Sequence, residues 1–382
     1  MLADRTSGTF NIVAFIALFP GAFLYQVGVA TNTIPAFAGG YFGIACLALL
    51  LVLAGRYAKR LTTTMRMPVF DAAYFGFLGY FAAVALSFAL VNGDDRLLGW
   101  HLGAVYQALC VFLLFKGLPD ITPRHTRCLW LCVMIMTTCI FYFMSNGAFS
   151  LKTLSGGNPN VSTYQGFALY YLVTAMLAIA KTERRHLRLS VYPCLCVALY
   201  VNGARSELVG FLIFICMFEV LSTKQKLAWA FALFSFAAVI GLTAQSWQAL
   251  LPENRVARLT TLNEDTSYQV RNNILHAGLS KISDNVLMGS YGDYEKGYYI
   301  HGILSVWQDL GLIGLLYYCG LIAVPLTTAS MALIRHRGND ADQAFVISAL
   351  VACLILLIFA KYFTYLLLPA VLGYHAAQKC GR

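Results

Sequence analysis

Three residues of this chain carry side chains that suit group transfer at a membrane surface: Arg205, Arg271 and His301. Guanidinium groups bind phosphate oxygens through paired hydrogen bonds, which a lysine cannot form. Histidine is the side chain best suited to accept a proton near neutral pH. Together they predict chemistry on a phosphate-linked substrate, in which the arginines neutralise a pyrophosphate leaving group and His301 is a candidate base.

Each of these residues also has a structural interpretation. Arg205 lies in NGARSEL at 202–208, between two apolar runs, where it would snorkel to lipid headgroups or pair with Glu207. Arg271 on an amphipathic surface helix would contact headgroups only. His301 would be an interfacial polar residue, and Asp309, in an otherwise apolar helix, would need a backbone or tyrosine partner. The sequence leaves both interpretations open.

Four further residues are candidates for substrate binding: Arg258, Tyr294, Tyr298 and Glu207. The tyrosines would stack on sugars or form an interfacial aromatic belt. Asp94 and Asp95 could begin a metal site, but Arg96 follows them and a solvated loop is favoured, so neither a metal nor another cofactor is expected. The chain also lacks a phosphate-binding Gly-rich loop, an HExxH motif and a GxSxG motif, so ATP hydrolysis and common hydrolase chemistry are unsupported.

The elements that must position these residues are membrane-spanning helices. The chain is 59% hydrophobic and only 12% charged, with a mean hydropathy of +0.68, whereas a soluble domain carries about 25% charged residues. Runs of about 20 apolar residues recur along the chain. The sequence therefore predicts an all-α polytopic membrane protein, with residues 1–382 forming a single membrane domain.

About twelve spans are expected from the apolar runs. Their predicted bounds are 10–30, 35–55, 69–91, 97–118, 128–146, 163–180, 187–203, 206–223, 226–244, 302–334, 343–360 and 362–378. Basic residues gather in every second connection, so the positive-inside rule places both termini in the cytoplasm. The same rule places the connection at 245–301 outside.

That large outer loop is predicted to contain a short amphipathic helix over 266–282. Thr266 and Gln269 have the spacing of a capping box, and apolar residues follow at helical intervals. The next apolar run, 302–334, would be about 50 Å long as one helix against about 30 Å of hydrocarbon. A break is therefore expected near Gly311, Gly314 or Pro325.

The net charge of +10 would suggest nucleic acid in a soluble protein. Here the charges lie mostly in short loops, so topology and anionic lipid explain them, and the bilayer rather than nucleic acid is the expected partner. The eleven cysteines have no paired spacing and lie mostly in apolar runs, where they act as small hydrophobic residues.

Three stretches of the chain resemble the O-antigen polymerase and ligase superfamily of bacterial membrane glycosyltransferases. They are NPNVSTYQG at 158–166, NGARSELVGFLIF at 202–214, and the arginine-helix region YQVRNNILHAGLSKISDNVLMGSYGDY at 268–294 with its continuation HGILSVWQDLGLIGLLYY at 301–318. The resemblance implies a helical bundle of the GT-C type. It also implies an undecaprenyl-pyrophosphate-linked glycan as donor, with Arg205 and Arg271 at its pyrophosphate.

Ligases of that superfamily have His-Asn at a fixed distance before Gly-Leu-Ile-Gly. Counted back from Gly311, Ile300 takes the histidine position and His301 the asparagine position, which favours a polymerase over a ligase. The expectation is a metal-independent polymerase of lipopolysaccharide or other polysaccharide in the bacterial inner membrane, with its large loop in the periplasm. A chain-length regulator and a flippase are candidate partners. The alternatives are an O-antigen ligase acting on lipid A-core and a lipid-linked-glycan flippase or transporter.

Overall fold

The computed structural model describes all residues except 1, 38–39, 94, 120, 158–160, 162–163, 224–265, 295–297, 336–339 and 381–382. Within the described residues every regular element is a helix. Two compact units emerge from the contacts along the chain. The first comprises 1–42, 120–262 and 329–352, and the second comprises 43–119, 263–328 and 353–382. The single membrane domain expected from the sequence stays a prediction.

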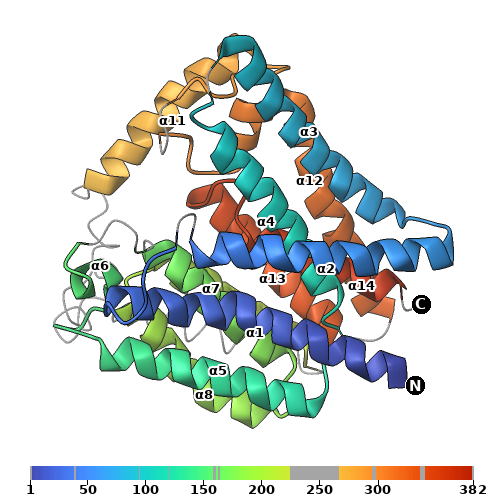
Figure 1. The fold of residues 1–382 in the computed structure, drawn as a ribbon, viewed down its shortest axis with the longest axis vertical. Helices are drawn as coiled ribbons and strands as arrows, with labels where there is room; N and C mark the ends of the chain where they lie inside the picture. The colour runs from blue at the N-terminus through green and yellow to red at the C-terminus, as the bar shows by residue number, and fades with distance from the viewer. Residues whose placement is uncertain are drawn as a thin grey trace. The chain divides into compact units, whose positions relative to one another are not determined.

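The first unit is a layered helical bundle (Figure 1). Its helices are α1 Leu2–Ala30, α5 Pro123–Tyr142, α6 Leu151–Leu154, α7 Tyr164–Ala180, α8 Arg185–Val201 and α9 Arg205–Leu221. The helix α7 lies at the centre and packs on α1, α5, α8 and α9. Nearly every described side chain of α7 is buried, and Phe167 stacks on Phe23 of α1 with ring centroids 3.9 Å apart. This unit is thus held by an apolar core.

The second unit contains α2 Tyr41–Thr64, α3 Val69–Asn92, α4 Leu98–Lys116, α11 Thr266–Asp284, most of α12 Leu304–Arg335, the end of α13 Ala341–Phe359 and α14 Leu367–Cys380. The helix α4 packs against both α3 and α14 (Figure 1). Because α4 touches helices that come early and late in the sequence, it brings residues near 100 and residues near 362 into one unit.

Seven described helices are long and apolar enough to cross a membrane: α1 from Gly8, α2, α3, α4, α5, α12 and α13. The chain is therefore a polytopic helical membrane protein. The helices α7, α8, α9 and α14 coincide with four more predicted spans but are shorter. The predicted span at 226–244 lies outside the described residues, so a count of about twelve spans stays a prediction, as does the GT-C bundle.

Three predicted spans have bounds that differ clearly from those of the helices. The spans 128–146 and 362–378 correspond to α5 Pro123–Tyr142 and α14 Leu367–Cys380. The run 35–55 was expected to cross the membrane, but α2 begins at Tyr41 and continues to Thr64, past Arg56 and Lys59. Residues 35–37 and Gly40 are not helical. Hydropathy marks where residues are apolar, whereas a helix continues through arginine and lysine, which are good helix formers and extend their charges to water.

The expected break in the apolar run 302–334 occurs at Gly311, whose backbone has φ 67° and ψ −174°. The turn that follows α11 docks against this break. The amide of Leu312 donates to the carbonyl of Val286 at 3.0 Å, and the amide of Ser290 donates to the carbonyl of Gln308 at 2.6 Å. A Cβ on Gly311 would overlap the carbonyl oxygen of Leu287, so only glycine allows this close approach. The kink and the turn thus form one backbone-to-backbone joint.

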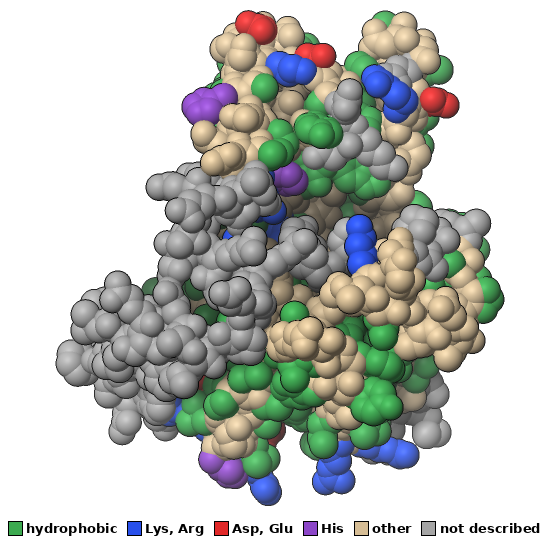
Figure 2. All heavy atoms as spheres, turned by 90° about the vertical axis from the view of Figure 1, so that its left-hand side faces the viewer, with side chains coloured by type: hydrophobic (Ala, Val, Ile, Leu, Met, Phe, Trp, Pro, Cys, Tyr) green, Lys and Arg blue, Asp and Glu red, His purple; other side chains and the backbone are tan. Residues whose placement is uncertain are grey.

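The predicted amphipathic helix 266–282 is confirmed as α11, Thr266–Asp284. Ile282 is buried and Ile274 is half-buried, while Val270 and Leu279 are exposed. The apolar stripe is therefore only partly covered by the second unit. Figure 2 shows basic and acidic side chains standing out at the end of the molecule where α11 lies.

Candidate functional site

A buried carboxylate lies at the centre of the candidate site in the second unit. Asp309 is in α12, two residues before the Gly311 kink, and is fully buried. The hydroxyls of Tyr362 and Tyr294 both donate to its Oδ2 atom, the latter at 2.9 Å. Its Oδ1 atom has no hydrogen-bond partner among the described residues. This confirms the expectation that Asp309 needs a tyrosine partner.

A buried histidine extends the network around this carboxylate. The Nε2 atom of His101 in α4 lies 3.2 Å from the hydroxyl of Tyr362, and its Nδ1 atom contacts the hydroxyl of Tyr291. Because the Tyr362 hydroxyl donates to Asp309, its oxygen is left to accept from Nε2–H. Nδ1 then accepts from Tyr291. The hydrogen bonds from Tyr291 through His101 and Tyr362 thus all run toward Asp309.

Aromatic rings form a platform beside this network, made of Trp100, Tyr299 and Tyr362. Trp100 stacks on Tyr299 and on Tyr362, each with ring centroids 5.5 Å apart. Tyr299 lies 4.4 Å from Tyr362 by the same measure. Stacked rings present flat apolar faces with polar edges, an arrangement that suits contact with sugar rings as well as internal packing.

Two cations lie near His301, next to the platform. The ring of His301 packs edge-on against Tyr299 at 4.9 Å. Burial and, to a smaller extent, the charges of Arg271 and Lys361 together lower the pKa of His301 to about 4. Burial also raises the pKa of Tyr299, an effect that Arg271 partly offsets. Arg271, Lys361 and His301 therefore form a cationic cluster in which the histidine is neutral at pH 7.

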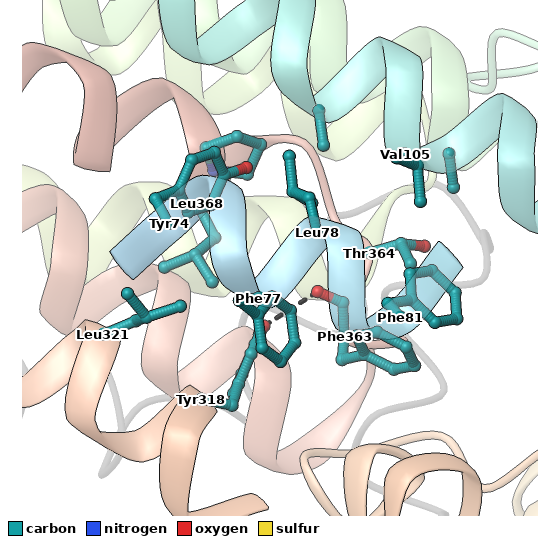
Figure 3. A pocket seen from close by; sticks show the side chains of 13 residues that line it. Tyr74, Phe77, Leu78, Phe81, Val105, Tyr318, Leu321, Phe363, Thr364 and Leu368 are labelled. Carbon is teal, nitrogen blue, oxygen red and sulfur yellow. Dashed lines mark hydrogen bonds between the residues drawn. The ribbon is translucent and has the colours of Figure 1, made fainter. Parts of the chain in front are cut away.

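The second unit also contains an apolar pocket, whose lining side chains are drawn in Figure 3. Its walls come from α3, α4, α12 and the segment 363–369, and they are hydrophobic apart from a few hydroxyls. One of these, on Tyr318, donates to the carbonyl of Phe363 at 2.8 Å, drawn as a dashed line in Figure 3. Phe81 links the two regions, because it lines the pocket and packs on His101 at 5.2 Å. The site thus has a polar side and a hydrocarbon-like side.

The candidate residues fall in different parts of the structure. Arg271, His301 and Tyr294 belong to the second unit, and Arg271 and His301 share the cationic cluster. Arg205, half-buried, is the first residue of α9 in the first unit, and only three residues separate it from the end of α8, as the sequence predicted. Tyr298 is 58% exposed. Arg258 lies outside the described residues, and a two-arginine clamp stays a prediction.

Two of the predicted substrate-binding residues are more enclosed than expected. Glu207 is fully buried in the first turn of α9, where the hydroxyl of Ser206 donates to it at 2.7 Å. Tyr294 is half-buried with its hydroxyl committed to Asp309. Burial and the Asp309 charge raise the pKa of Tyr294, so its hydroxyl stays protonated and able to donate. The substrate-binding role of both residues stays a prediction.

The sequence did not point to His101, Lys361, Trp100 or Tyr362 as site residues. One signal was available, because a histidine in the predicted span 97–118 and a lysine between the spans 343–360 and 362–378 are ionisable groups in or beside apolar runs. In the part of the chain that the structure describes, no group of three or more His, Cys, Asp or Glu residues could hold a metal ion.

Comparison with protein-family models finds none that matches the chain, and comparison with curated proteins finds no match either.

Proposed function

We propose that this chain is a bacterial polysaccharide repeat-unit polymerase. It transfers a growing glycan from undecaprenyl pyrophosphate onto a lipid-linked repeat unit at the outer face of the inner membrane. The observation that carries the proposal is the packing of His301 on Tyr299 of the aromatic platform, at a place where the charges of Arg271 and Lys361 act on the histidine. Cations stabilise a departing pyrophosphate, and aromatic rings hold sugars.

The topology predicted from basic residues supports this location. Residues 97–118 and 302–334 begin at the outer face in that topology, and 343–360 ends there. His101, Asp309 and Lys361 come from these three ends, and all take part in the site. The site is therefore expected to face the periplasm, where flipped lipid-linked glycans are presented.

The residues of the site suit the two parts of such a donor. Arg271 and Lys361 neutralise the pyrophosphate, and Trp100 and Tyr299 offer ring faces to the sugars. That Arg205 also binds the pyrophosphate is implied by the resemblance and stays a prediction.

An O-antigen ligase is the second candidate, and the place of His301 favours it. Although the count from Gly311 puts His301 one residue away from the ligase position, its ring lies in the cationic cluster. A ligase would use the same donor with lipid A-core as acceptor. The two functions therefore differ in the acceptor and not in the donor site.

Deletion of the gene distinguishes the two candidates. Surface glycan is run on a gel beside the extracted lipid-linked pool. Core bearing single repeat units, with no long lipid-linked chains, supports the polymerase. Bare core, with long polymer remaining on undecaprenyl pyrophosphate, supports the ligase. Unchanged surface glycan together with an unchanged lipid-linked pool contradicts both.

The substitution Arg271→Ala tests the site itself. It removes the guanidinium next to His301 and is expected to lower lipid-linked polymerisation about 100-fold or more at normal expression. Lys281→Ala is the matched control on the same helix, since Lys281 pairs with Asp293 at the surface at 3.0 Å. An exposed pair contributes little, so this control should keep activity. Full activity in Arg271→Ala would overturn the assignment.

A further inference from the structure

We propose that Asp309 is the proton acceptor of the transfer reaction and that the hydroxyl of Tyr294 passes the proton to it. This inference rests on the proposed polymerase function and assigns its base. The sequence offered His301 for that role. The hydrogen-bond network of the second unit favours Asp309 instead.

The environment of the Asp309 carboxylate suits a proton acceptor. Asp309 is fully buried, and no ion pair to it is found among the described residues. Its oxygens accept hydrogen bonds from phenol hydroxyls only, and Oδ1 accepts none. Burial opposes the charged form, and the donated hydrogen bonds favour it. A carboxyl group under these opposed influences can both lose and gain a proton.

The hydrogen bonds of the network share one donor-to-acceptor direction, toward Asp309. The tyrosines Tyr294 and Tyr362 both donate to Oδ2, and His101 and Tyr291 continue the chain behind Tyr362. Every series of hydrogen bonds in the network therefore ends at Asp309. A proton that enters at any hydroxyl of this network moves toward Asp309 without any side chain changing its partner.

The residues of the network differ in how far they are exposed. Tyr362, His101 and Tyr291 are buried, whereas Tyr294 is half-buried and its ring lies 6.3 Å from Tyr299 on the aromatic platform. Tyr362 is itself part of that platform but is buried, so Tyr294 is the more exposed of the two network members at the place proposed for the sugars. The Tyr294 hydroxyl can accept from an acceptor hydroxyl while it donates to Asp309.

His301 is a weak base. Burial, Arg271 and Lys361 hold its pKa at about 4, far below the pH at which the reaction takes place. A base with so low a pKa gives little driving force for proton transfer at neutral pH. His301 is neutral there and serves as a hydrogen-bonding group beside the phosphates.

The proposed step transfers the glycan from its pyrophosphate to the acceptor hydroxyl. The acceptor hydroxyl oxygen forms a bond to the anomeric carbon as the bond from that carbon to the pyrophosphate oxygen breaks. The electron pair of the broken bond leaves with the pyrophosphate, next to Arg271 and Lys361. The hydroxyl proton passes to Tyr294, whose own proton passes to Asp309. The carboxylic acid then returns its proton to water or to the released pyrophosphate.

The test is elongation of lipid-linked repeat units by the purified full-length protein in detergent, at pH values from acidic to neutral. Asp309→Asn keeps an oxygen that accepts from both tyrosines but cannot take up a proton. We expect activity to fall about 100-fold or more, while the unfolding temperature is unchanged or higher because a buried charge is removed. Tyr294→Phe should lower activity in the same way.

Tyr80→Phe is the matched control. Tyr80 donates to the carbonyl of Leu310 at 3.0 Å, next to Asp309 but outside the network. Its loss should leave elongation nearly unchanged. The wild-type rate should fall at acidic pH as Asp309 becomes protonated, with Tyr291, Tyr294 and Tyr362 facing it and His101 behind Tyr362. The residual activity of Asp309→Asn should lack this dependence, whereas Asp309→Glu should restore both part of the rate and the dependence.

The outcomes separate this inference from the proposed function. Elongation that is lost in Arg271→Ala but retained in Asp309→Asn overturns the role of Asp309 and leaves the polymerase standing. If Asp309→Asn loses activity and also has a lower unfolding temperature, the role of Asp309 is structural. That result overturns the inference as well. If the wild-type protein elongates no lipid-linked substrate, the proposed function fails and this inference fails with it.

Discussion

Among the described residues of the second unit, Asp71 and Asp309 have fully buried carboxylates, and their charges are compensated differently. Asp71 lies in the first turn of α3. Its Oδ2 atom accepts hydrogen bonds from the ammonium of Lys116 and from the hydroxyl of Tyr57. The helix N-terminus adds a partial positive charge. Asp309 lies beyond the first turn of α12 and has only tyrosine hydroxyls as donors among the described residues.

This difference separates a structural carboxylate from one that suits chemistry. An ion pair fixes the charge of both partners, so Asp71 cannot change protonation without leaving Lys116 uncompensated. Asp309 can, because its hydrogen-bond donors are neutral. In the predicted topology Asp71 and Lys116 lie at the cytoplasmic ends of their spans and Asp309 at the periplasmic end of its span. The reactive end of the unit would thus be the one without a buried ion pair at its carboxylate.

The largest expected effect comes from breaking the ion pair. Lys116→Ala leaves Asp71 buried and uncompensated and should lower the free energy of unfolding by about 3–5 kcal/mol. Unfolding in detergent, followed by denaturant titration, measures the loss. The double variant Asp71→Asn, Lys116→Met should recover most of it, since no charge remains. A loss no greater than that of Lys281→Ala would mean that Asp71 and Lys116 are not a buried pair.

A smaller effect is expected at the kink beside Asp309. Gly311→Ala places a Cβ against the carbonyl of Leu287 in a backbone region open almost only to glycine. It should cost about 2–4 kcal/mol of unfolding free energy. It should also impair elongation, because the joint holds Asp309 in place. Gly320→Ala on the same helix has open space around its Cβ and is the control. Equal stability of the two variants would contradict the observed joint.

The smallest effect is a pH dependence of stability at the site end of the unit. The pKa of His301 is about 4 in the folded protein, against an ordinary value of 6.5. Between these values the unfolded chain binds a proton that the folded chain does not. Stability should therefore be full above about pH 6.5 and fall by roughly 1 kcal/mol toward pH 4, since His301 is partly exposed.

The substitution His301→Gln tests the origin of that dependence. Thermal unfolding curves at several pH values between 4 and 7 are compared for the two proteins. The variant should lose the decrease in unfolding temperature at the acidic end. A dependence that is the same in both proteins would show that another group titrates in this range, and that His301 is not held neutral by Arg271 and Lys361.

The sequence predicted the helices well where the signal is local. The span 69–91 is α3, Val69–Asn92, and the helix 266–282 is α11, Thr266–Asp284, because apolar runs and capping residues act within one element. A break near Gly311, Gly314 or Pro325 was also predicted, since a helix of about 50 Å does not fit a bilayer, and it occurs at the first of these. The start of α2 was not, because apolar residues continue before the helix begins.

The site was predicted only in part, for a physical reason. Arg271 and His301 stood out as polar residues of one loop, and the structure places them together. His101, Asp309 and Tyr362 come from three separate apolar runs, and their meeting depends on how α4, α12 and the segment before α14 pack. No spacing within one element encodes a contact between residues 261 positions apart.

The ion pair at α3 and α4 has a consequence for biosynthesis. Asp71 and Lys116 are 45 residues apart on consecutive spans. Each charge alone opposes insertion into lipid, though by less than the roughly 2.5–3.5 kcal/mol of a mid-membrane charge because both lie at span ends. Both partners have been synthesised once α4 is complete. The two spans can then leave the translocon as a neutral hairpin. Asp309 acquires Tyr362 only after nearly the whole chain has been made, so its network is among the last parts of the protein to assemble.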